Sequence, residues 1–199
     1  MCKHMQRKLL LLLFAFLPLY GLWMFGQGVW IHAKAQLAQV LLESAWSQTL
    51  QGQKEVKPWP WADTWPVGRL TVPRLGEHRI VLAGASGSSL AFGPGHLFNT
   101  GFPGEGGNCV IVGHRDTHLD FLRVLEKGDH ILLQSRSGES IAYEVVSMII
   151  VDEQAQNVLS QDIGEALTLI TCYPFDAVRP GGPLRFVVVA RPVSRSIII

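Results

Sequence analysis

Short β-forming runs separated by glycine and proline constrain the fold of this chain more than any other feature. Strands of this length with turn residues between them are typical of an antiparallel barrel or sandwich. Gly138 lies in the short stretch between two of the runs and supplies the positive φ that a hairpin turn needs. We therefore predict a mainly β domain, with one or two helical turns around residues 119–125. The runs occupy residues 69–73, 78–83, 108–112, 130–134, 140–151, 167–171 and 185–191.

The N-terminal region has a different character. Residues 9–31 contain no Asp, Glu, Lys or Arg. A helix of that length, rising about 1.5 Å per residue, crosses a hydrocarbon core about 30 Å thick. A cleaved secretory signal is the competing interpretation, because Ala33, Lys34 and Ala35 resemble a cleavage site. Signal peptides, however, have apolar regions of only about 7 to 15 residues, so we predict an uncleaved transmembrane anchor.

Basic residues set the orientation of this anchor. Lys3, Arg7 and Lys8 precede the span, and only Lys34 follows it directly. The positive-inside rule leaves the N-terminus in the cytoplasm and the rest of the chain outside. The predicted segments are a cytoplasmic stub (residues 1–8), a transmembrane anchor (9–31), a juxtamembrane helix with a Pro- and Trp-rich connector (32–66), the β domain (67–193) and a tail (194–199).

The connector contains three tryptophans. Trp59, Trp61 and Trp65 stand among prolines that disfavour a helix, so an extended strap is expected here. These side chains fit the membrane interface, a substrate groove, or simple packing of the strap against the domain.

The overall charge excludes one class of partner. The chain has 17 Lys and Arg against 16 Asp and Glu, a net charge of +1. Nucleic-acid-binding domains usually carry a basic stripe, whereas the basic residues of this chain are dispersed. Zinc-finger, RRM and KH signatures are also absent from the sequence, so we expect no nucleic-acid partner.

Three cysteines make an odd count, so at least one thiol is expected to be unpaired. Cys2 belongs to the predicted cytoplasmic stub, which leaves Cys109 and Cys172 as a possible disulfide in an oxidising compartment. Cys109 lies within an apolar strand, where free cysteine commonly packs as a small buried hydrophobic residue. We favour the buried free thiol.

Cys172 is the candidate nucleophile. The preceding residues alternate as a strand, and Tyr173 and Pro174 end it, so the sulfur is expected at an accessible rim. A thiol attacks as the thiolate, of which only a few per cent is present in an ordinary cysteine near neutral pH. A proton carrier and a positive charge are therefore expected nearby.

His114 is the best candidate for the proton carrier. It follows an apolar strand through Gly113, so it is expected to project from a strand end as Cys172 does. The spacing of His114 and His118 also suits two metal ligands. Asp116 alone does not complete such a site, and the glutamate of a zinc-protease motif is missing. We predict no metal and no cofactor.

Two arginines follow Cys172 closely. A guanidinium stays protonated and can stabilise an oxyanion. Arg179 and Arg185 both qualify by their positions, and both also fit the simpler interpretation of solvated loop charges beside a Gly- and Pro-rich stretch.

With these residues established, residues 67–193 resemble the sortase family of membrane-anchored cysteine transpeptidases, and within it the class of Gram-negative proteobacteria. The sequence Thr-Leu-Ile-Thr-Cys at residues 168–172 reproduces the family's TLxTC signature. The stretch leading to Gly-His-Arg at 113–115 is similar to the segment before the catalytic histidine, and Arg185 is similar to the arginine that opens the last strand. The resemblance implies an eight-stranded sortase-type β-barrel with short helices.

The resemblance also implies a mechanism. Cys172 attacks a carbonyl in a C-terminal sorting signal of a substrate protein and forms a thioacyl enzyme. His114 protonates the departing amine, and Arg185 holds the oxyanion, although the flexible composition of the loop leaves Arg179 as an alternative. An amine acceptor, whose identity the sequence does not reveal, then receives the acyl group. The expected location is the inner membrane, with the catalytic domain on the periplasmic side.

Two other functions use the same residues. A cysteine protease would resolve the thioester with water, although a papain-type enzyme is disfavoured because its cysteine precedes its histidine. A non-catalytic, membrane-tethered β module would bind proteins and simply bury Cys172.

Overall fold

The computed structural model describes residues 2–154, 164–179 and 181–193, with side chains from residue 14 onward except that of residue 15. The chain forms two compact units, residues 1–40 and 41–199. The helix α1 (Cys2–Leu50) begins in the first unit and ends in the second. The juxtamembrane helix predicted within residues 32–66 is present as the last part of α1, which ends at Leu50.

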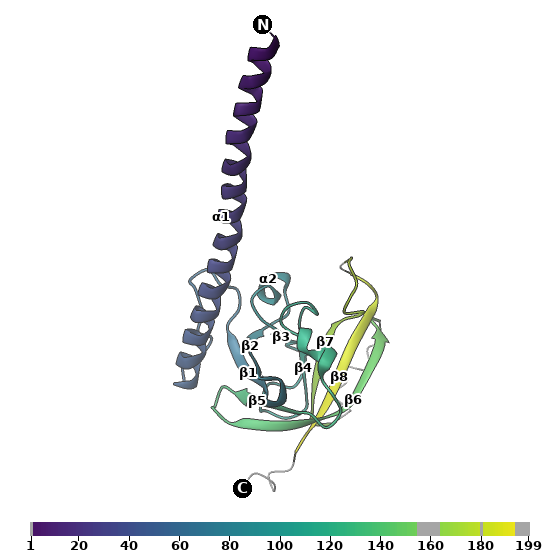
Figure 1. Ribbon diagram of the computed structural model, residues 1–199. Helices are drawn as coiled ribbons and strands as arrows, with labels where there is room; N and C mark the ends of the chain where they lie inside the picture. The colour runs from purple at the N-terminus through teal and green to yellow at the C-terminus, as the bar shows by residue number, and fades with distance from the viewer. Residues whose placement is uncertain (1, 155–163, 180, 194–199) are drawn as a thin grey trace. The chain divides into compact units, whose positions relative to one another are not determined.

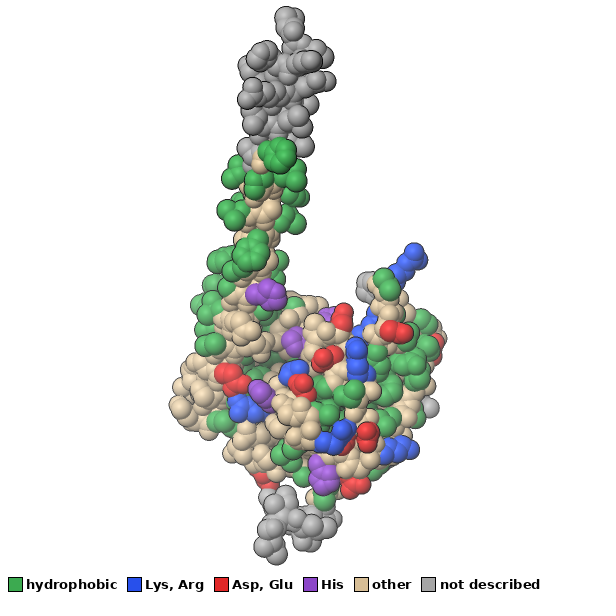
Figure 2. Space-filling model, viewed as in Figure 1, with side chains coloured by type: hydrophobic (Ala, Val, Ile, Leu, Met, Phe, Trp, Pro, Cys, Tyr) green, Lys and Arg blue, Asp and Glu red, His purple; other side chains and the backbone are tan. Residues whose placement is uncertain are grey.

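The transmembrane span predicted over residues 9–31 is not found. Within the described part of the chain, no helix combines the length and the apolar character that crossing a membrane requires. The side chains of residues 9–13 and 15 of the predicted span lie outside those described. From residue 14 onward, hydrophobic side chains line the described part of α1 (Figure 2).

The second unit is built on eight strands that close into a barrel in the order β1-β2-β3-β4-β7-β8-β6-β5 (Figure 1). The eight-stranded barrel implied by the family resemblance is confirmed. The short helices are η1 (Pro73–Leu75), α2 (Gly87–Leu90) and η2 (Asp120–Val124). The strands are β1 (Pro66–Val72), β2 (Glu77–Ala83), β3 (Gly95–His96), β4 (Asn108–Val112), β5 (His130–Ser135), β6 (Ser140–Asp152), β7 (Ala166–Cys172) and β8 (Leu184–Pro192).

Seven of these strands correspond to the seven predicted runs, and β3 was missed. With only two residues, β3 is too short to show any alternation. The pairing also differs from a purely antiparallel barrel, because β2 pairs with β3, and β4 with β7, in parallel. The predicted hairpin turn is confirmed: the Ser135 amide donates to the Glu139 carbonyl at 2.8 Å, and Gly138 has φ 85°.

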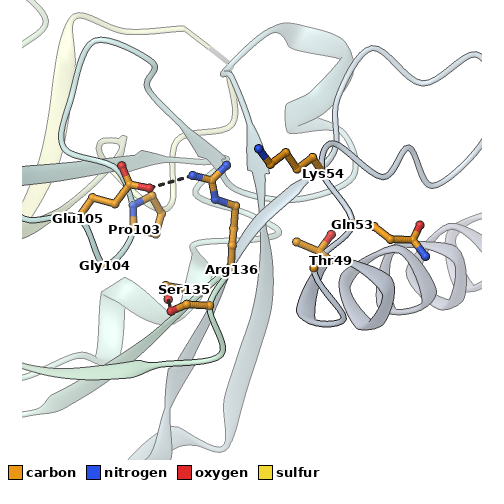
Figure 3. A pocket seen from close by; sticks show the side chains of 10 residues that line it. Thr49, Gln53, Lys54, Pro103, Gly104, Glu105, Ser135 and Arg136 are labelled. Atoms are coloured by element: carbon orange, nitrogen blue, oxygen red, sulfur yellow. Dashed lines mark hydrogen bonds and ion pairs between the residues drawn. The ribbon is translucent and has the colours of Figure 1, made fainter.

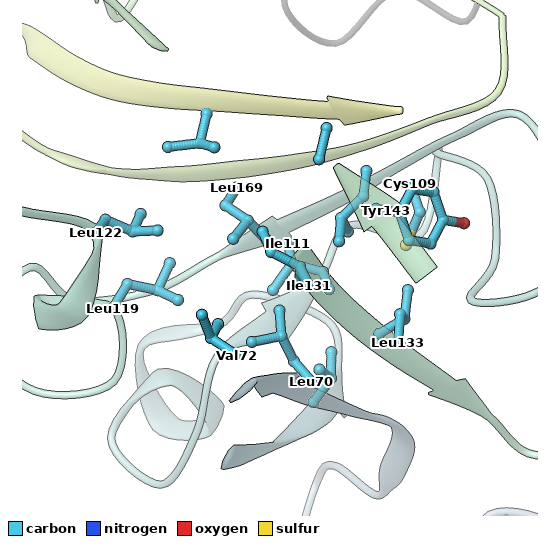
Figure 4. Close-up of a cluster of buried hydrophobic side chains, with 14 of the residues drawn as sticks. Leu70, Val72, Cys109, Ile111, Leu119, Leu122, Ile131, Leu133, Tyr143 and Leu169 are labelled. Carbon is cyan, nitrogen blue, oxygen red and sulfur yellow. The ribbon is translucent and has the colours of Figure 1, made fainter. Parts of the chain in front are cut away.

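The main core fills the barrel with the inward side chains of alternating strand positions (Figure 4). Leu167 and Leu169 of β7 are both fully buried in it. Cys109 lies in the same core as a free thiol, which confirms the favoured interpretation. Burial raises the pKa of this thiol to about 12, so Cys109 stays protonated and unreactive near neutral pH.

The end of α1 and the connector cover part of the barrel within the second unit. Leu42 and Trp46 pack with Ile80 and Leu82 of β2 in a smaller buried cluster. In the connector, the ring of Trp59 meets that of Phe92 edge to face at 4.8 Å. Trp65 packs on the main core, whereas Trp61 is 83% exposed. Two of the three tryptophans therefore fasten the strap to the domain.

Candidate active site

Cys172 and Arg185 lie directly opposite each other at the ends of two paired strands. Cys172 is the last residue of β7, and its register partner on β8 is Arg185. Directly opposed residues of an antiparallel pair project from the same face of the sheet. Both side chains are half-buried. The rim position that the sequence predicted for Cys172 is therefore confirmed, and Arg185 shares it.

The face that carries this pair is the outer face of the barrel. Side chains alternate along β7, so Cys172 is on the opposite face from the inward Leu169. Ile170, two residues before Cys172 and on the same outer face, forms a third apolar cluster with Val110 of β4 and Val187 of β8. These three side chains are buried, and the partly exposed Leu97, Val112 and Val151 pack against them, so the outer surface on the side of Cys172 is apolar.

His114 stands at the same end of the barrel. Strand β4 ends at Val112, whose partner on β7 is Ile170. His114 comes two residues after Val112, just as Cys172 comes two residues after Ile170, and the His114 side chain is exposed. The ends of parallel neighbouring strands meet at one edge of the sheet. All three residues predicted to be catalytic are therefore gathered at one end of three adjacent strands.

The turn that carries His114 is fastened to β7. The hydroxyl of Thr171 donates to the Gly113 carbonyl at 2.7 Å, and the Gly113 amide donates to the Ile170 carbonyl at 3.2 Å. Thr171 is buried, so the side chain before Cys172 has a structural role. These bonds fix the backbone on both sides of the gap between the candidate nucleophile and the candidate proton carrier.

Arg185 is engaged by a carboxylate that sequence reasoning did not select. Its Nη2 donates to Glu153 Oε2 at 2.6 Å, and its Nη1 donates to the Leu184 carbonyl at 2.9 Å. Glu153 directly follows β6, whose end pairs with the start of β8. Both side chains of the ion pair are partly exposed, and exposed pairs contribute only about 0–1 kcal/mol. An anionic group on a substrate can therefore compete with Glu153.

Arg115 is the second residue that sequence reasoning missed as a functional group. Arg115 is buried, with an exposed fraction of 8%. It donates to the carbonyls of Pro174 at 2.8 Å, Ala177 at 2.8 Å and Arg179 at 3.2 Å. All three acceptors belong to the loop that joins Cys172 to Arg185. The only signal in the sequence was the position of Arg115 directly after His114.

The alternative arginine and two further histidines have other surroundings. Arg179 is exposed, and the structure uses its carbonyl as an acceptor for Arg115. His96 is fully buried on β3, where its Nε2 lies 2.8 Å from the Gly101 carbonyl, and burial lowers its pKa. Burial also lowers the pKa of His118, whose Nε2 lies 3.4 Å from the Ala91 carbonyl. Among the described residues, no three side chains of the metal-binding types gather in one place.

Aromatic rings pack the base of the loop between Cys172 and Arg185. The rings of Tyr173 and Phe186 stack with centroids 6.3 Å apart, and Phe175 meets Phe186 edge to face at 5.2 Å. The guanidinium of Arg123 lies 5.5 Å from the centre of the Phe175 ring. The loop is therefore held both by these ring contacts and by the hydrogen bonds of Arg115.

Such a barrel with cysteine, histidine and arginine at one rim defines a class of cysteine transpeptidases. A family model described as "Sortase domain" matches residues 70–193. Sortase D of Bacillus subtilis (strain 168) is 34% identical over 128 residues, which make up 64% of this chain and 64% of that protein. The chain belongs to the sortase family.

Solved structures agree on the fold. Sortase C-1 of Actinomyces oris is similar with a TM-score of 0.57 and 29% identity, covering 64% of this chain and 72% of that one. A structure of Clostridium perfringens sortase C with the C-terminal cell wall sorting motif is similar with a TM-score of 0.58, covering 80% of this chain and 89% of that one. At 20% identity, this second likeness concerns the fold alone.

Proposed function

We propose that this chain is a cysteine transpeptidase that cuts a C-terminal sorting signal of a substrate protein and transfers the new C-terminus to an amine. The observation that carries the proposal is the direct pairing of Cys172 with Arg185 at the barrel end to which His114 also projects. A nucleophile, a proton carrier and a permanent cation are the groups that acyl transfer through a thioester requires.

In the first half of the reaction, the Cys172 thiolate forms a bond to the carbonyl carbon of the scissile amide. Arg185 donates hydrogen bonds to the oxyanion that develops, because its guanidinium keeps its charge throughout. The imidazolium of His114 gives its proton to the departing nitrogen as the C–N bond breaks. The products are a thioester on Cys172, a neutral imidazole and a free amine.

In the second half, the acceptor amine attacks the thioester carbonyl. The neutral imidazole of His114 takes the proton that the amine loses, and the C–S bond breaks. A new amide forms, and the thiolate and imidazolium are restored. Because Glu153 is bonded to the Arg185 guanidinium, its carboxylate competes with the substrate oxygen for that guanidinium.

The proposed substrate is a protein with a C-terminal sorting signal. The solved structure of Clostridium perfringens sortase C contains such a motif. In this chain, the partly exposed Leu97, Val112 and Val151 form an apolar floor on the face that carries Cys172. Apolar side chains of an extended peptide can bury against that floor, which favours an apolar signal before the scissile bond.

Product analysis separates transfer from hydrolysis. The full-length protein is incubated with sorting-type peptides and a panel of amines, and the products are weighed by mass spectrometry. Transfer predicts amide products with the mass of the added amine, and Cys172→Ala predicts neither cleavage nor transfer. If only the carboxylic acid forms at every amine concentration, the chain is a protease and the transfer step is wrong.

A thiol probe separates an enzyme from a binding module. Iodoacetamide is expected to label Cys172 faster in the wild type than in His114→Ala, because an activated thiolate depends on its partner. The matched control is His78→Ala, an exposed histidine at the start of β2. Equal labelling rates in all three proteins would support the non-catalytic module.

The class and location are part of the same proposal: a sortase of the Gram-negative class, anchored in the inner membrane with the barrel in the periplasm. Support comes from residues 9–31, which contain no charged side chain, and from exposed apolar side chains such as Trp23 (65%) and Phe25 (72%). A membrane-impermeant maleimide added to spheroplasts should label Cys172, and should label Cys2 only after lysis. Labelling of Cys2 in intact spheroplasts, or recovery of the protein in the soluble fraction, would contradict this location.

A further inference from the structure

A hollow lies at the end of the barrel opposite Cys172. Strands β4 and β7 are parallel and carry the candidate site at their C-terminal ends, whereas this hollow borders the segment before β4 and the turn between β5 and β6. The cavity has a volume of about 410 Å³, within the range of about 300–1,000 Å³ typical of small-molecule sites. Its walls come from residues 49–54, 103–105 and 135–137, all within the barrel unit (Figure 3).

Positive charge exceeds negative charge in the lining. Lys54 and Arg136 are the cations, and Glu105 is the single carboxylate. Figure 3 shows the Lys54 ammonium directed across the opening toward the Arg136 guanidinium. Two like charges facing each other repel unless an anion lies between them. Since Glu105 compensates only one of the two, the lining is suited to a ligand that carries negative charge.

Arg136 is already held in place for such a ligand. Its guanidinium carbon lies 4.2 Å from the centre of the Phe102 ring, and its Nη2 donates to Glu105 Oε1 at 2.8 Å. A guanidinium has five N–H donors, and this bond uses one of them. The Phe102 ring covers one face of the guanidinium. The N–H groups along its edge stay available to bind an anion through paired hydrogen bonds.

Hydroxyl groups also line the cavity. The Oγ atoms of Ser135 and Ser137 lie 2.7 Å apart and share one hydrogen bond, which leaves further donor and acceptor capacity. Gly104 forms the facing wall with φ 84°, and a Cβ added there would lie 2.7 Å from the Ser135 Cβ. The wall is thus closely packed, and the hydroxyls are presented on a preformed surface.

We propose that this cavity binds a small anion that bears hydroxyl groups, a sugar phosphate or a sugar acid, with its anionic group between Lys54 and Arg136. The charges select the anionic group, and the serine hydroxyls and the Gln53 amide select the hydroxyl-bearing body. The proposal is independent of the transfer reaction, because the cavity and Cys172 lie at opposite ends of the barrel.

Isothermal titration calorimetry of the full-length protein tests the proposal with four probes: glucose 6-phosphate, glucuronate, inorganic phosphate and glucose. The two sugar anions are expected to bind more tightly than inorganic phosphate, and glucose is expected not to bind. Lys54→Gln and Arg136→Gln should each weaken binding about tenfold or more, since a hydrogen bond to a charged group is lost. Arg136→Lys keeps the positive charge but lacks the forked donors of the guanidinium. Its affinity should therefore lie between that of the wild type and that of Arg136→Gln.

Lys57→Gln is the matched control, because Lys57 is exposed on the same connector but does not line the cavity. It should bind as the wild type does, and so should Cys172→Ala, which separates this proposal from the transfer reaction. The melting temperature of each variant shows that it is folded. Absence of binding in the wild type, unchanged affinity in Lys54→Gln, or inorganic phosphate binding as tightly as glucose 6-phosphate would overturn the proposal.

Discussion

At the scale of single residues, Arg115 has the most informative surroundings. It is buried without a carboxylate partner among the described contacts, and three main-chain carbonyls surround its guanidinium. A buried charge is costly unless hydrogen bonds compensate it. Because those carbonyls belong to the loop between Cys172 and Arg185, we interpret Arg115 as a positioning residue that acts through this loop.

Arg115→Gln should lower kcat of the transfer reaction roughly ten- to hundredfold, because small displacements of reacting groups have effects of that size. KM should change less, and Arg115→Lys should recover part of the loss. Steady-state kinetics and hydrogen exchange of the amides in residues 173–179 measure both effects. The control is Arg123→Gln. The Arg123 guanidinium lies over the ring of Phe175 in the same loop but, in the described part of the chain, makes no hydrogen bond to the carbonyls that Arg115 binds, so this variant should keep kcat near the wild-type value. An unchanged kcat in a folded Arg115→Gln would show that Arg115 has no positioning role.

His96 predicts a pH dependence of stability. Burial lowers its pKa in the folded state from the ordinary value of 6.5, so the unfolded chain binds the proton more readily. The stabilising effect of neutral His96 is complete above pH 6.5 and is lost as the pH falls toward the lower, folded-state pKa. The free energy of unfolding should therefore decrease between pH 7.5 and pH 5.

Urea unfolding at the two pH values measures this decrease. His96→Gln should be less stable throughout but should show a smaller difference between them, with the remainder due in part to His118, whose pKa is also lowered. Exposed His78→Gln is the control and should keep the full difference. Asp129 does not contribute to the difference between pH 7.5 and pH 5. Arg74 lowers the pKa of the Asp129 carboxyl from 3.8, so its contribution to stability is lost only at lower pH. An equal pH difference in His96→Gln and the wild type would refute the assignment.

At the scale of elements, the residue that follows β6 binds the arginine at the start of β8. Glu153 holds the guanidinium of Arg185 in the absence of substrate. Glu153→Gln removes the competing charge, and since an exposed ion pair contributes at most about 1 kcal/mol, kcat/KM should rise by no more than about fivefold. Asp152→Asn, at the preceding position, should leave kcat/KM unchanged. A fall in kcat/KM for Glu153→Gln would mean that Glu153 positions Arg185 rather than competing for it.

The elements also show where sequence patterns are sufficient. Strand β7 was predicted because its residues alternate and a proline follows, and Cys172 was correctly placed at its end. Strand β3 has two residues and no pattern to detect. The parallel pairing of β4 with β7 brings Val112 beside Ile170. Local sequence patterns do not predict which strands become neighbours in a sheet.

At the scale of the whole molecule, the boundary between the units falls inside α1. Leu42 and Trp46 belong to the barrel unit and are buried against β2. A chain of residues 41–199 should therefore fold with nearly the stability of the full chain. Removing residues 1–50 should destabilise the barrel by about 3–5 kcal/mol, the cost of deleting a large buried aromatic side chain.

Chemical denaturation of both truncated proteins measures the difference. Trp46→Ala in the 41–199 protein should reproduce most of the loss, and Leu50→Ala, whose side chain is 38% exposed, should not. Equal stability of the two truncated proteins would contradict the packing described for Trp46.

The sequence alone determined the β character of residues 67–193, the strand-end positions of Cys172 and His114, and the sortase resemblance. These follow from local alternation, turn residues and a short motif, all of which are readable along the chain. Only the tertiary structure placed Arg185 opposite Cys172, Glu153 on Arg185, and Arg115 on a loop 59 to 64 residues away. The cavity beside Arg136 likewise joins three distant segments. Such contacts depend on how the barrel closes, and local periodicity contains no information about closure.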